Sequence, residues 1–421
     1  MNISKATKAA AIMVLAGLGL TACGSGGGGG IDGATQKSGA AGTTTITFAA
    51  AMFAESGRGP KLQALLDDFN KSQSEVKVEP ASIPFASFAP TIFTQMGGGV
   101  GPDLIRFDIS DFYSGVEAGL LEPLDGHIEA KDYKFLAPDK YNLVDGKRYG
   151  VTFEISNYAL LYNPTLVPTP PTTFDEFLTA AKAATKDGAY GFGFRTTMPE
   201  QAGMWQDLSN FVYGFGGNWS DGEKLTLNSP DVVEGITKFR DVYAAEVTPK
   251  GADASTYRRM FGDSKLGMEI DNGGVPAILF GQTPSLPLDA VKSPFPEDTV
   301  GQILTPLVMN ASSKNKEASA KFVKWLLEPA NQAKLQLVLG AGNPATKVER
   351  TAEELKAMPF VDTYDSLTDK GRPFVVEGFE TKTPDIRKIV VEQAIKVLQT
   401  GEDPKAAMDA AQKTAEAQIS R

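Results

Sequence analysis

The chain has one cysteine among 421 residues, and this limits how its fold can be stabilised. A single thiol forms no disulfide within the chain, so the fold must depend on its apolar core. The chain is long enough for this, because the fraction of surface buried on folding rises with size. Hydrophobic residues make up 42% of it. The length predicts two or three domains.

The first 22 residues have the composition of a secretion signal. Lys5 and Lys8 form a short basic segment, and Ala9 to Leu20 is a run of small and apolar residues. The run is too short to span a bilayer as a stable helix. It is typical of the apolar part of a signal peptide. We therefore expect residues 1–22 to be removed and the protein to be exported.

The sole cysteine stands directly after this segment. Leu20-Thr21-Ala22-Cys23 resembles the lipobox of bacterial lipoproteins, which implies that Cys23 is acylated and anchors the chain to the outer face of the cell membrane. The alternative is an ordinary signal peptide with an accidental cysteine. Residues 23–42 are mostly glycine, alanine and serine, which predicts a flexible tether with a reach on the order of 25 Å.

The charge of the chain argues against two classes of partner. The formal net charge is −10, and removal of residues 1–22 takes away two lysines and makes it −12. An acidic balance of this size disfavours nucleic acid or an anionic lipid surface as the main partner.

The rest of the chain alternates short apolar strands with amphipathic helices, which indicates an α/β fold. Capping residues predict two helix starts, at Thr173 to Glu176 and at Ser229-Pro230. We find no internal repeat of fixed period. Strands are predicted at 45–49, 76–78, 103–107 and 158–162, and later helices at 316–327, 331–339 and 386–398.

Several segments resemble, in order, the family 1 extracellular solute-binding proteins of ABC importers, and in particular the maltose-type sugar binders. Each match is short, but together they cover nearly the whole chain after the tether. The segments are Gly101 to Ile105, Gly119 to Leu124, Tyr149 to Asn163, Thr173 to Phe177, Lys265 to Ile270 and Ser319 to Leu326.

The resemblance implies a periplasmic-binding-protein-like fold, in which two α/β lobes joined by hinge strands close over a ligand. It places the first lobe at residues 43–152 and 292–345, and the second at 153–291 and 346–421. It implies a monomer that delivers a sugar to a membrane permease and needs no metal or cofactor. Clefts between lobes and at the ends of α/β sheets favour ligand binding on physical grounds as well.

Sugar recognition needs aromatic faces for the ring and carboxylates or amides for the hydroxyl groups. Glu154 lies at the spacing from Tyr149 where maltose-type binders place a ligand-contacting glutamate. Gly274 stands where many relatives have tryptophan, which suggests a different ring or a smaller ligand. The candidate ligand-binding residues are Phe53, Glu55, Phe107, Asp108, Asp111, Glu154, Trp205, Gln206, Trp219, Asp271, Asn272, Gly273 and Asn343.

These candidates have structural alternatives. Trp219 could pack over a turn, Asn343 could shape one, and the carboxylates of Glu55, Asp108 and Asp111 could be solvated or cap helices. For Glu154→Ala and Trp205→Ala, we expect ligand binding at least about tenfold weaker and unchanged stability of the free protein.

Two rival classes of function remain open. An enzyme has little support, because His127 is the only histidine and no Gly-x-Ser-x-Gly motif or phosphate-binding loop occurs in the body. A glycan-active enzyme needs only two carboxylates, however. A surface lipoprotein that binds another protein, such as an adhesin, is the other alternative.

Overall fold

The computed structural model describes residues 42–55 and 57–419. All of them belong to one compact unit, Gly39–Arg421. The expected signal peptide, nearly all of the expected tether and Cys23 lie outside the described residues.

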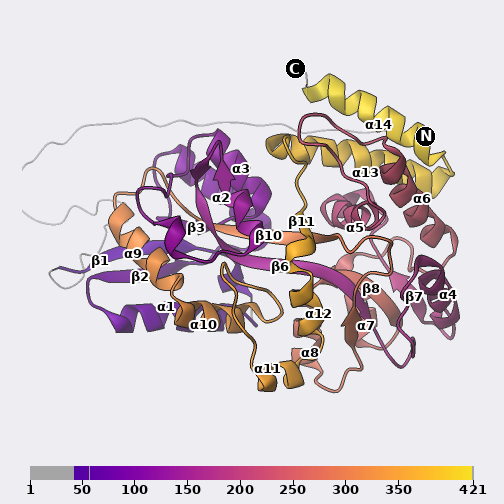
Figure 1. Cartoon of the computed structure of the whole chain (residues 1–421), viewed down its shortest axis with the longest axis horizontal. Coiled ribbons are helices and arrows are strands. Elements are labelled where there is room, and N and C mark those ends of the chain that lie inside the picture. The colour runs from indigo at the N-terminus through magenta and orange to yellow at the C-terminus, as the bar shows by residue number, and fades with distance from the viewer. Residues whose placement is uncertain (1–41, 56, 420–421) are drawn as a thin grey trace, which may run out of the picture. The chain divides into compact units, whose positions relative to one another are not determined.

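A mixed sheet is the centre of this unit (Figure 1). Strand β1 pairs in parallel with β2 and β3, β10 runs antiparallel to β3 and β6, and β8 runs antiparallel to β6 and parallel to β7. The order along the sheet is β2 (Val76–Ala81), β1 (Thr44–Ala49), β3 (Leu104–Arg106), β10 (Val300–Met309), β6 (Gly150–Tyr162), β8 (Leu266–Asn272) and β7 (Tyr190–Gly193).

Four short strands complete the described β-structure. β9 (Asp289–Val291) pairs with β6, β11 (Gly371–Pro373) pairs with β10, and β4 (Leu143–Val144) and β5 (Lys147–Arg148) form a separate two-stranded sheet.

Helices cover both faces of each half of the sheet, and we call these halves, with their helices, the first and second lobe. The first lobe has α1 (Gly59–Ser72), α9 (Lys316–Leu326) and α10 (Pro329–Leu339) on one face. Its other face carries α2 (Phe85–Gly97) and α3 (Ile109–Glu117).

The second lobe has the same layered arrangement. Helices α4 (Phe174–Ala184), α5 (Gln201–Gly214), α6 (Pro230–Ala244), α13 (Thr383–Thr400) and α14 (Pro404–Ile419) share one apolar core. The other core contains α7 (Ala254–Gly262), α8 (Gly274–Gln282), α11 (Ala352–Ala357) and α12 (Val361–Ser366).

Six 3₁₀ segments lie between these elements in the described chain. They are η1 (Ala51–Ala54), η2 (Ala130–Asp132), η3 (Ala137–Asn142), η4 (Met198–Glu200), η5 (Thr368–Lys370) and η6 (Glu380–Lys382).

Strand β6 joins the two lobes. All 13 of its residues are buried. Its first part pairs with β10, which also pairs with β3 of the first lobe, and its last part pairs with β8 of the second lobe. The predicted strand at 158–162 is therefore only the end of a longer one. Because both faces of β6 are covered, its sequence shows no alternation that would reveal its length. The predicted α/β, two-lobed fold class is confirmed.

Both predicted helix starts are confirmed. The Thr173 side chain accepts a hydrogen bond from the backbone N–H of Glu176, and α4 begins at Phe174. The Ser229 side chain accepts one from Val232 N–H, with Pro230 at the first position of α6. A side-chain oxygen at the N-cap satisfies one of the free N–H groups of the first turn.

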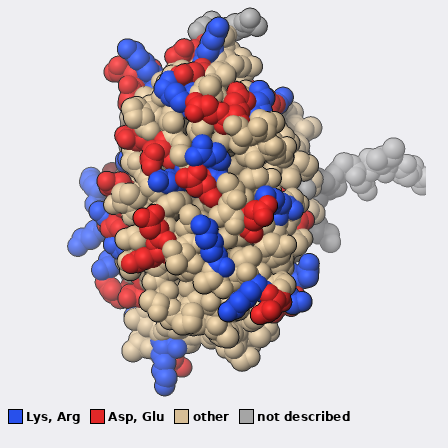
Figure 2. All heavy atoms as spheres, turned by 90° about the vertical axis from the view of Figure 1, so that its right-hand side faces the viewer, with Lys and Arg blue, Asp and Glu red and all other residues tan. Residues whose placement is uncertain are grey.

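Among the described residues, no helix is long and apolar enough to cross a membrane. On the face seen in Figure 2, lysine and arginine are interspersed with aspartate and glutamate, and no large area has a single sign of charge. That face shows no positively charged patch of the kind that binds nucleic acid or an anionic membrane.

Candidate functional site

Two polar clusters lie along β6, where this strand passes from one lobe to the other. Glu154 pairs with Thr305 of β10, and Tyr158, four residues further along β6, pairs with Asn272 of β8. At about 3.3 Å per residue, these two positions are roughly 13 Å apart along the strand. The clusters around them come from different lobes.

The first cluster is centred on Glu154, whose side chain is 5% exposed. Arg58, just before α1, places Nη1 2.8 Å from Glu154 Oε1 and Nε 2.6 Å from Glu55 Oε2. Arg106, at the end of β3, donates to Glu154 Oε2. Burial alone would raise the pKa of Glu154, but the two guanidinium groups outweigh it and lower the pKa. Glu154 is therefore ionised at neutral pH.

Two further carboxyl groups lie at the start of α3. Burial raises the pKa of Asp108, which occupies the N-cap position without capping the helix; Arg106 opposes the rise and Glu154 adds to it. Burial also raises the pKa of Asp111 to about 7, with a contribution from Asp108 and opposition from Arg387 of α13. Asp111 is therefore only partly ionised near neutral pH.

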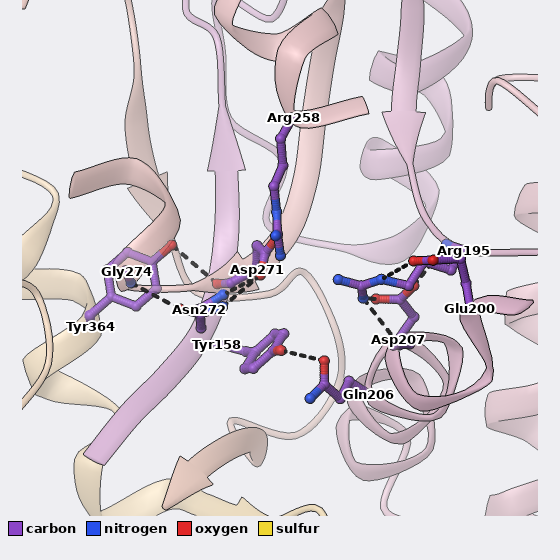
Figure 3. A network of polar contacts seen from close by, with 11 residues as sticks. Tyr158, Arg195, Glu200, Gln206, Asp207, Arg258, Asp271, Asn272, Gly274 and Tyr364 are labelled. Carbon is purple, nitrogen blue, oxygen red and sulfur yellow. Dashed lines mark hydrogen bonds and ion pairs between the residues drawn. The ribbon is translucent and has the colours of Figure 1, made fainter. Parts of the chain in front are cut away.

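The second cluster gathers around the end of β8 (Figure 3). Arg258 of α7 forms two contacts with Asp271 Oδ2, from Nε at 2.8 Å and from Nη2 at 2.7 Å. Asp271 Oδ1 accepts a hydrogen bond from Asn272 N–H at 2.8 Å. Asn272 Oδ1 in turn accepts one from Gly274 N–H at 3.0 Å. Tyr364 donates its hydroxyl proton to the carbonyl of Asp271.

Helix α5 adds a buried ion pair to this cluster. Arg195 Nη1 lies 2.7 Å from Asp207 Oδ1, and both side chains are 5% exposed. Burial raises the pKa of Asp207 to about 6 although Arg195 opposes it. Tyr158 donates a hydrogen bond to Gln206 Oε1 at 3.0 Å, which joins β6 to α5 (Figure 3).

Glu269 of β8 lies beside these groups and is fully buried. Neither of its carboxylate oxygens has a hydrogen-bond partner among the described residues. Burial raises the pKa of Glu269 to about 8, Asp271 raises it further, and Arg258 and Arg195 oppose the shift. A carboxyl group in this environment is predominantly protonated at neutral pH.

The structure brings the polar candidates together in two groups. Glu55, Asp108, Asp111 and Glu154 belong to the first cluster. The second cluster contains Gln206, Asp271 and Asn272, and Gly273 lies beside it.

Gly273 and Asn343 have evident structural roles next to the hinge. A Cβ atom on Gly273 would lie 2.9 Å from the carbonyl oxygen of Ala341. Asn343 pairs through its backbone with Ile155 of β6, and its side-chain amide donates to Asp365.

The aromatic candidates lie elsewhere. Trp205 and Trp219 stack with ring centroids 4.5 Å apart inside the core of the second lobe. Phe107 is buried against Phe93 in the first lobe, and Phe53 is half-buried against that lobe's other core. In this conformation a ligand does not reach the fully buried rings, because hydrophobic burial has placed them in the lobe interiors.

Sequence reasoning missed the cations of the site. Arg58, Arg106, Arg195, Arg258 and Arg387 belong to no motif, and a long charged side chain is most often solvated. Arg106 had a weak signal, since it stands at the end of an apolar strand. Glu269 had a clearer one, because it interrupts the apolar run Leu266 to Ile270.

Comparison with known proteins is consistent with this geometry. Residues 64–362 match the model of a family described as bacterial extracellular solute-binding protein. The match includes β6, β8 and β10 and most of both clusters.

Two of the relatives are known as saccharide-binding proteins. A maltotriose-binding protein of Pyrococcus abyssi is 29% identical over 255 residues, which are 58% of this chain and 54% of that protein. The aligned part thus spans about half of that relative. A galactooligosaccharide-binding protein of Bacillus subtilis is 24% identical over 379 residues, covering 83% of this chain and 84% of the relative.

Solved structures share the fold. The cyclic alpha-maltosyl-1,6-maltose binding protein of Arthrobacter globiformis has a TM-score of 0.77 at 20% identity, covering 89% of this chain and 99% of the other. At this identity the likeness concerns the arrangement of lobes and strands only.

Proposed function

The chain belongs to the bacterial extracellular solute-binding proteins, and we propose that it captures a saccharide between its two lobes and delivers it to an ABC permease. The observation that carries the proposal is the placement of Glu154 and Tyr158 on one strand, each joined to a polar cluster of a different lobe. The sugar-binding relatives support the class of ligand.

The chemistry of the two clusters suits a polyhydroxylated ligand. Adjacent sugar hydroxyls both donate and accept hydrogen bonds, and charged groups bind them more strongly than neutral ones. The first lobe offers carboxylates and guanidinium groups, and the second offers Arg258, Asp271, Asn272 and Gln206. A ligand that contacts both lobes stabilises the closed arrangement, which is how binding is coupled to hinge motion.

We extend the proposal to the anchoring of the protein. Acylation of Cys23 would hold an exported, monomeric receptor beside its permease through a flexible tether, and more than one acyl chain is needed for stable anchoring. Cys23→Ala should release the protein from the membrane fraction and leave ligand affinity unchanged. Continued sedimentation of this variant with membranes would remove the lipid anchor from the proposal.

A thermal-shift screen of the full chain tests the ligand class. A ligand that binds only the folded protein raises the melting temperature. At a ligand concentration of a hundred times its Kd, the free energy of unfolding rises by about 2.7 kcal/mol. We expect at least one mono- or oligosaccharide in a broad panel to do so, with calorimetry to confirm a 1:1 complex. No response to any saccharide would contradict the proposal and favour a protein-binding adhesin.

The same incubations separate binding from catalysis. A binding protein leaves the saccharide intact, whereas a glycan-active enzyme with two carboxylates would release new reducing ends. Accumulation of reducing ends that depends on the protein would contradict a pure binding function.

A further inference from the structure

A third segment of the chain crosses between the lobes beside β6 and β10. It comprises residues 340–351, between the end of α10 in the first lobe and the start of α11 in the second. The backbone of Asn343 exchanges two hydrogen bonds with Ile155 of β6, at 2.7 and 2.8 Å. The crossing segment is therefore joined to the central sheet, and its side chains lie at the hinge.

The buried side chain of Asn343 is hydrogen-bonded to both lobes. Its Oδ1 accepts a hydrogen bond from Gln336 Nε2 of α10 at 3.2 Å. Its Nδ2 donates to Asp365 Oδ1 of α12 at 2.9 Å and to Thr368 Oγ1 of η5 at 3.2 Å. Helix α10 belongs to an apolar core of the first lobe and α12 to one of the second. We call these four residues the polar bridge, because one amide connects the two lobes.

The other two crossing strands are bonded to the same residue of the second lobe. Asn157 Nδ2 of β6 donates to Thr368 Oγ1 at 3.0 Å, and Gln302 Nε2 of β10 donates to the Thr368 carbonyl at 3.1 Å. Gln302 also donates to Asn157 Oδ1 at 2.8 Å. All three crossing segments are thus held to η5, and the hydrogen bond from Gln336 to Asn343 is the side-chain contact through which this network reaches α10.

Arg350 forms a second contact between the end of α10 and the second lobe. Its Nη1 donates to the Gly340 carbonyl at 2.8 Å, and its Nε donates to Asp365 Oδ2 at 2.5 Å. The Arg350 side chain is 4% exposed. Hydrogen bonds from a charged donor are stronger than neutral ones, so the residue that follows α10 is fastened to α12.

Apolar packing between the lobes is incomplete beside the polar bridge. A cavity of about 570 Å³ is lined by Leu65 and Leu337 of the first lobe and by Phe280 and Met358 of the second, and Gln336 borders it. Side chains separated by a void lose their dispersion contacts. The hydrogen bonds of the bridge therefore make a larger share of the contact between the lobes here.

The bridge is formed while the polar clusters of the candidate site are closed off. The Glu154 side chain is 5% exposed and that of Asp271 is 1% exposed. Helix α3 of the first lobe packs against η6 of the second. A ligand reaches the two clusters only after the lobes move apart. The structure therefore represents the closed arrangement, and opening of the hinge moves α10 relative to α12 and η5.

We propose that Gln336 and Asn343 are positioning residues that hold the lobes in the closed arrangement, and that their hydrogen bond sets the ratio of closed to open protein. The proposal rests on the proposed function, since closure of the same cleft retains the ligand. An unpaired buried amide is costly, so loss of the bond should lower the closed-to-open ratio on the order of tenfold. Neither residue has to touch the ligand, because the ratio scales the apparent affinity.

Paramagnetic relaxation enhancement measures this ratio without any ligand. Cys23 is the only cysteine, so the full chain with Cys23→Ala and Glu117→Cys carries one spin label, at an exposed position of α3. The amides of η6 lie close to α3 in the closed protein and move away from the label as the lobes open. We expect Gln336→Met to lower the enhancement at η6 and to leave the amides of the first lobe near the label unchanged.

Gln332→Met is the matched control on the same helix. Gln332 is fully buried, one turn before Gln336, and its side chain is hydrogen-bonded to the Leu326 carbonyl and to Thr346. Thr346 pairs with Phe135 of the first lobe, so these hydrogen bonds stay within one lobe. Both variants should lose stability to urea, whereas only Gln336→Met should change the enhancement at η6.

A change on the other side of the bridge makes the test independent of one variant. Thr368→Val removes the hydroxyl that accepts hydrogen bonds from Asn157 and Asn343 and nearly keeps the shape of the side chain. It should lower the enhancement at η6 as Gln336→Met does. Unchanged enhancement in either folded variant, an equal decrease in Gln332→Met, or a parent without enhancement at η6 would overturn the polar bridge.

The two proposals fail separately. Saccharide binding in the thermal-shift screen together with an unchanged ratio of closed to open protein would overturn the polar bridge and leave the proposed function standing. A shifted ratio in a protein that responds to no saccharide would do the reverse.

Discussion

The buried carboxyl group of Glu269 provides a test of the electrostatics of the second lobe. It has no exposed surface, and neither oxygen has a hydrogen-bond partner within the described residues. Glu269→Gln keeps the shape of the side chain and removes its ability to ionise. Any difference in stability between the two proteins therefore reports on the proton of Glu269.

The magnitude follows from the shift in pKa. Burial raises the pKa of Glu269 to about 8, whereas a glutamate in an unfolded chain titrates near 4.3. Between these values the folded protein keeps a proton that the unfolded chain releases, so stability falls by about 1.4 kcal/mol per pH unit as pH rises. At pH 7 the loss amounts to about 3 to 4 kcal/mol. Glu269→Gln should therefore be more stable than the parent by about this amount, and equal to it near pH 4.

Urea unfolding at pH 5, 6, 7 and 8 measures the difference. Trp205 and Trp219 both lie in the core of the second lobe, while Trp325 packs against the core of the first. In a Trp325→Phe background, fluorescence follows the second lobe alone. Glu223→Gln, an exposed position of the same lobe, is the matched control and should give a difference that does not change with pH.

One result would refute the reasoning directly. If Glu269→Gln were less stable than the parent at pH 7, the carboxylate would have to be ionised and held by Arg258 and Arg195 in the folded protein. The stability difference would then have the opposite sign, because removing one partner of a buried charge network leaves the others uncompensated.

Three further changes test the packing around the hinge. Glu154→Gln should cost about 3 to 5 kcal/mol in thermal denaturation, because it removes the anion paired with Arg106 and one of the two paired with Arg58. Glu317→Gln, with a side chain that is 94% exposed, should cost almost nothing, and equal losses would contradict the network. Trp205→Ala should cost about 3 to 5 kcal/mol and perturb the near-ultraviolet signal of its partner Trp219; an unchanged spectrum would contradict the stacking. Asn157→Ala should cost about 1 to 3 kcal/mol in urea unfolding, since it removes a buried side-chain amide that forms hydrogen bonds with three groups. An unchanged free energy of unfolding would show that these hydrogen bonds do not stabilise the fold.

Local signals in the sequence identify much of the fold. The cap at Thr173 and the Ser229-Pro230 pair fix helix starts because the interactions are made within four residues. The helix predicted at 331–339 is α10, which begins two residues earlier at Pro329. Proline is favoured at the first position of a helix, so the start of α10 at Pro329 could also have been predicted from the sequence.

No local pattern indicates where the aromatic candidates lie, and the expectation for Trp205 changes accordingly. The last eight residues of α5, from Asp207 to Gly214, are buried, as are Met204 and Trp205. A helix buried nearly all round has no polar face from which to infer the orientation of one ring. Trp205→Ala and Glu154→Ala are therefore expected to destabilise the free protein, contrary to the inference from sequence, because both side chains are buried.

The charged contacts were beyond local reasoning for a different reason. Arg58 and Glu154 are 96 residues apart in the chain, and Arg106 and Glu154 are 48 apart. Nothing near either arginine distinguishes it from a solvated one. The contacts exist because the start of α1 and the end of β3 both lie beside β6. That arrangement follows from the order of strands in the sheet and not from any local segment.

The geometry of β6 and β10 indicates where the hinge can bend. Their pairing shifts register between Thr305 and Pro306, and proline has no N–H to donate to the neighbouring strand. A local break in the ladder lowers the cost of changing the angle between strands. Glu154 pairs with Thr305 at this break, so a ligand that binds the first cluster acts on the point where the two crossing strands are most easily bent. Ligand binding and closure of the lobes can then be coupled through the pair Glu154 and Thr305, without a chain of further residues between the lobes.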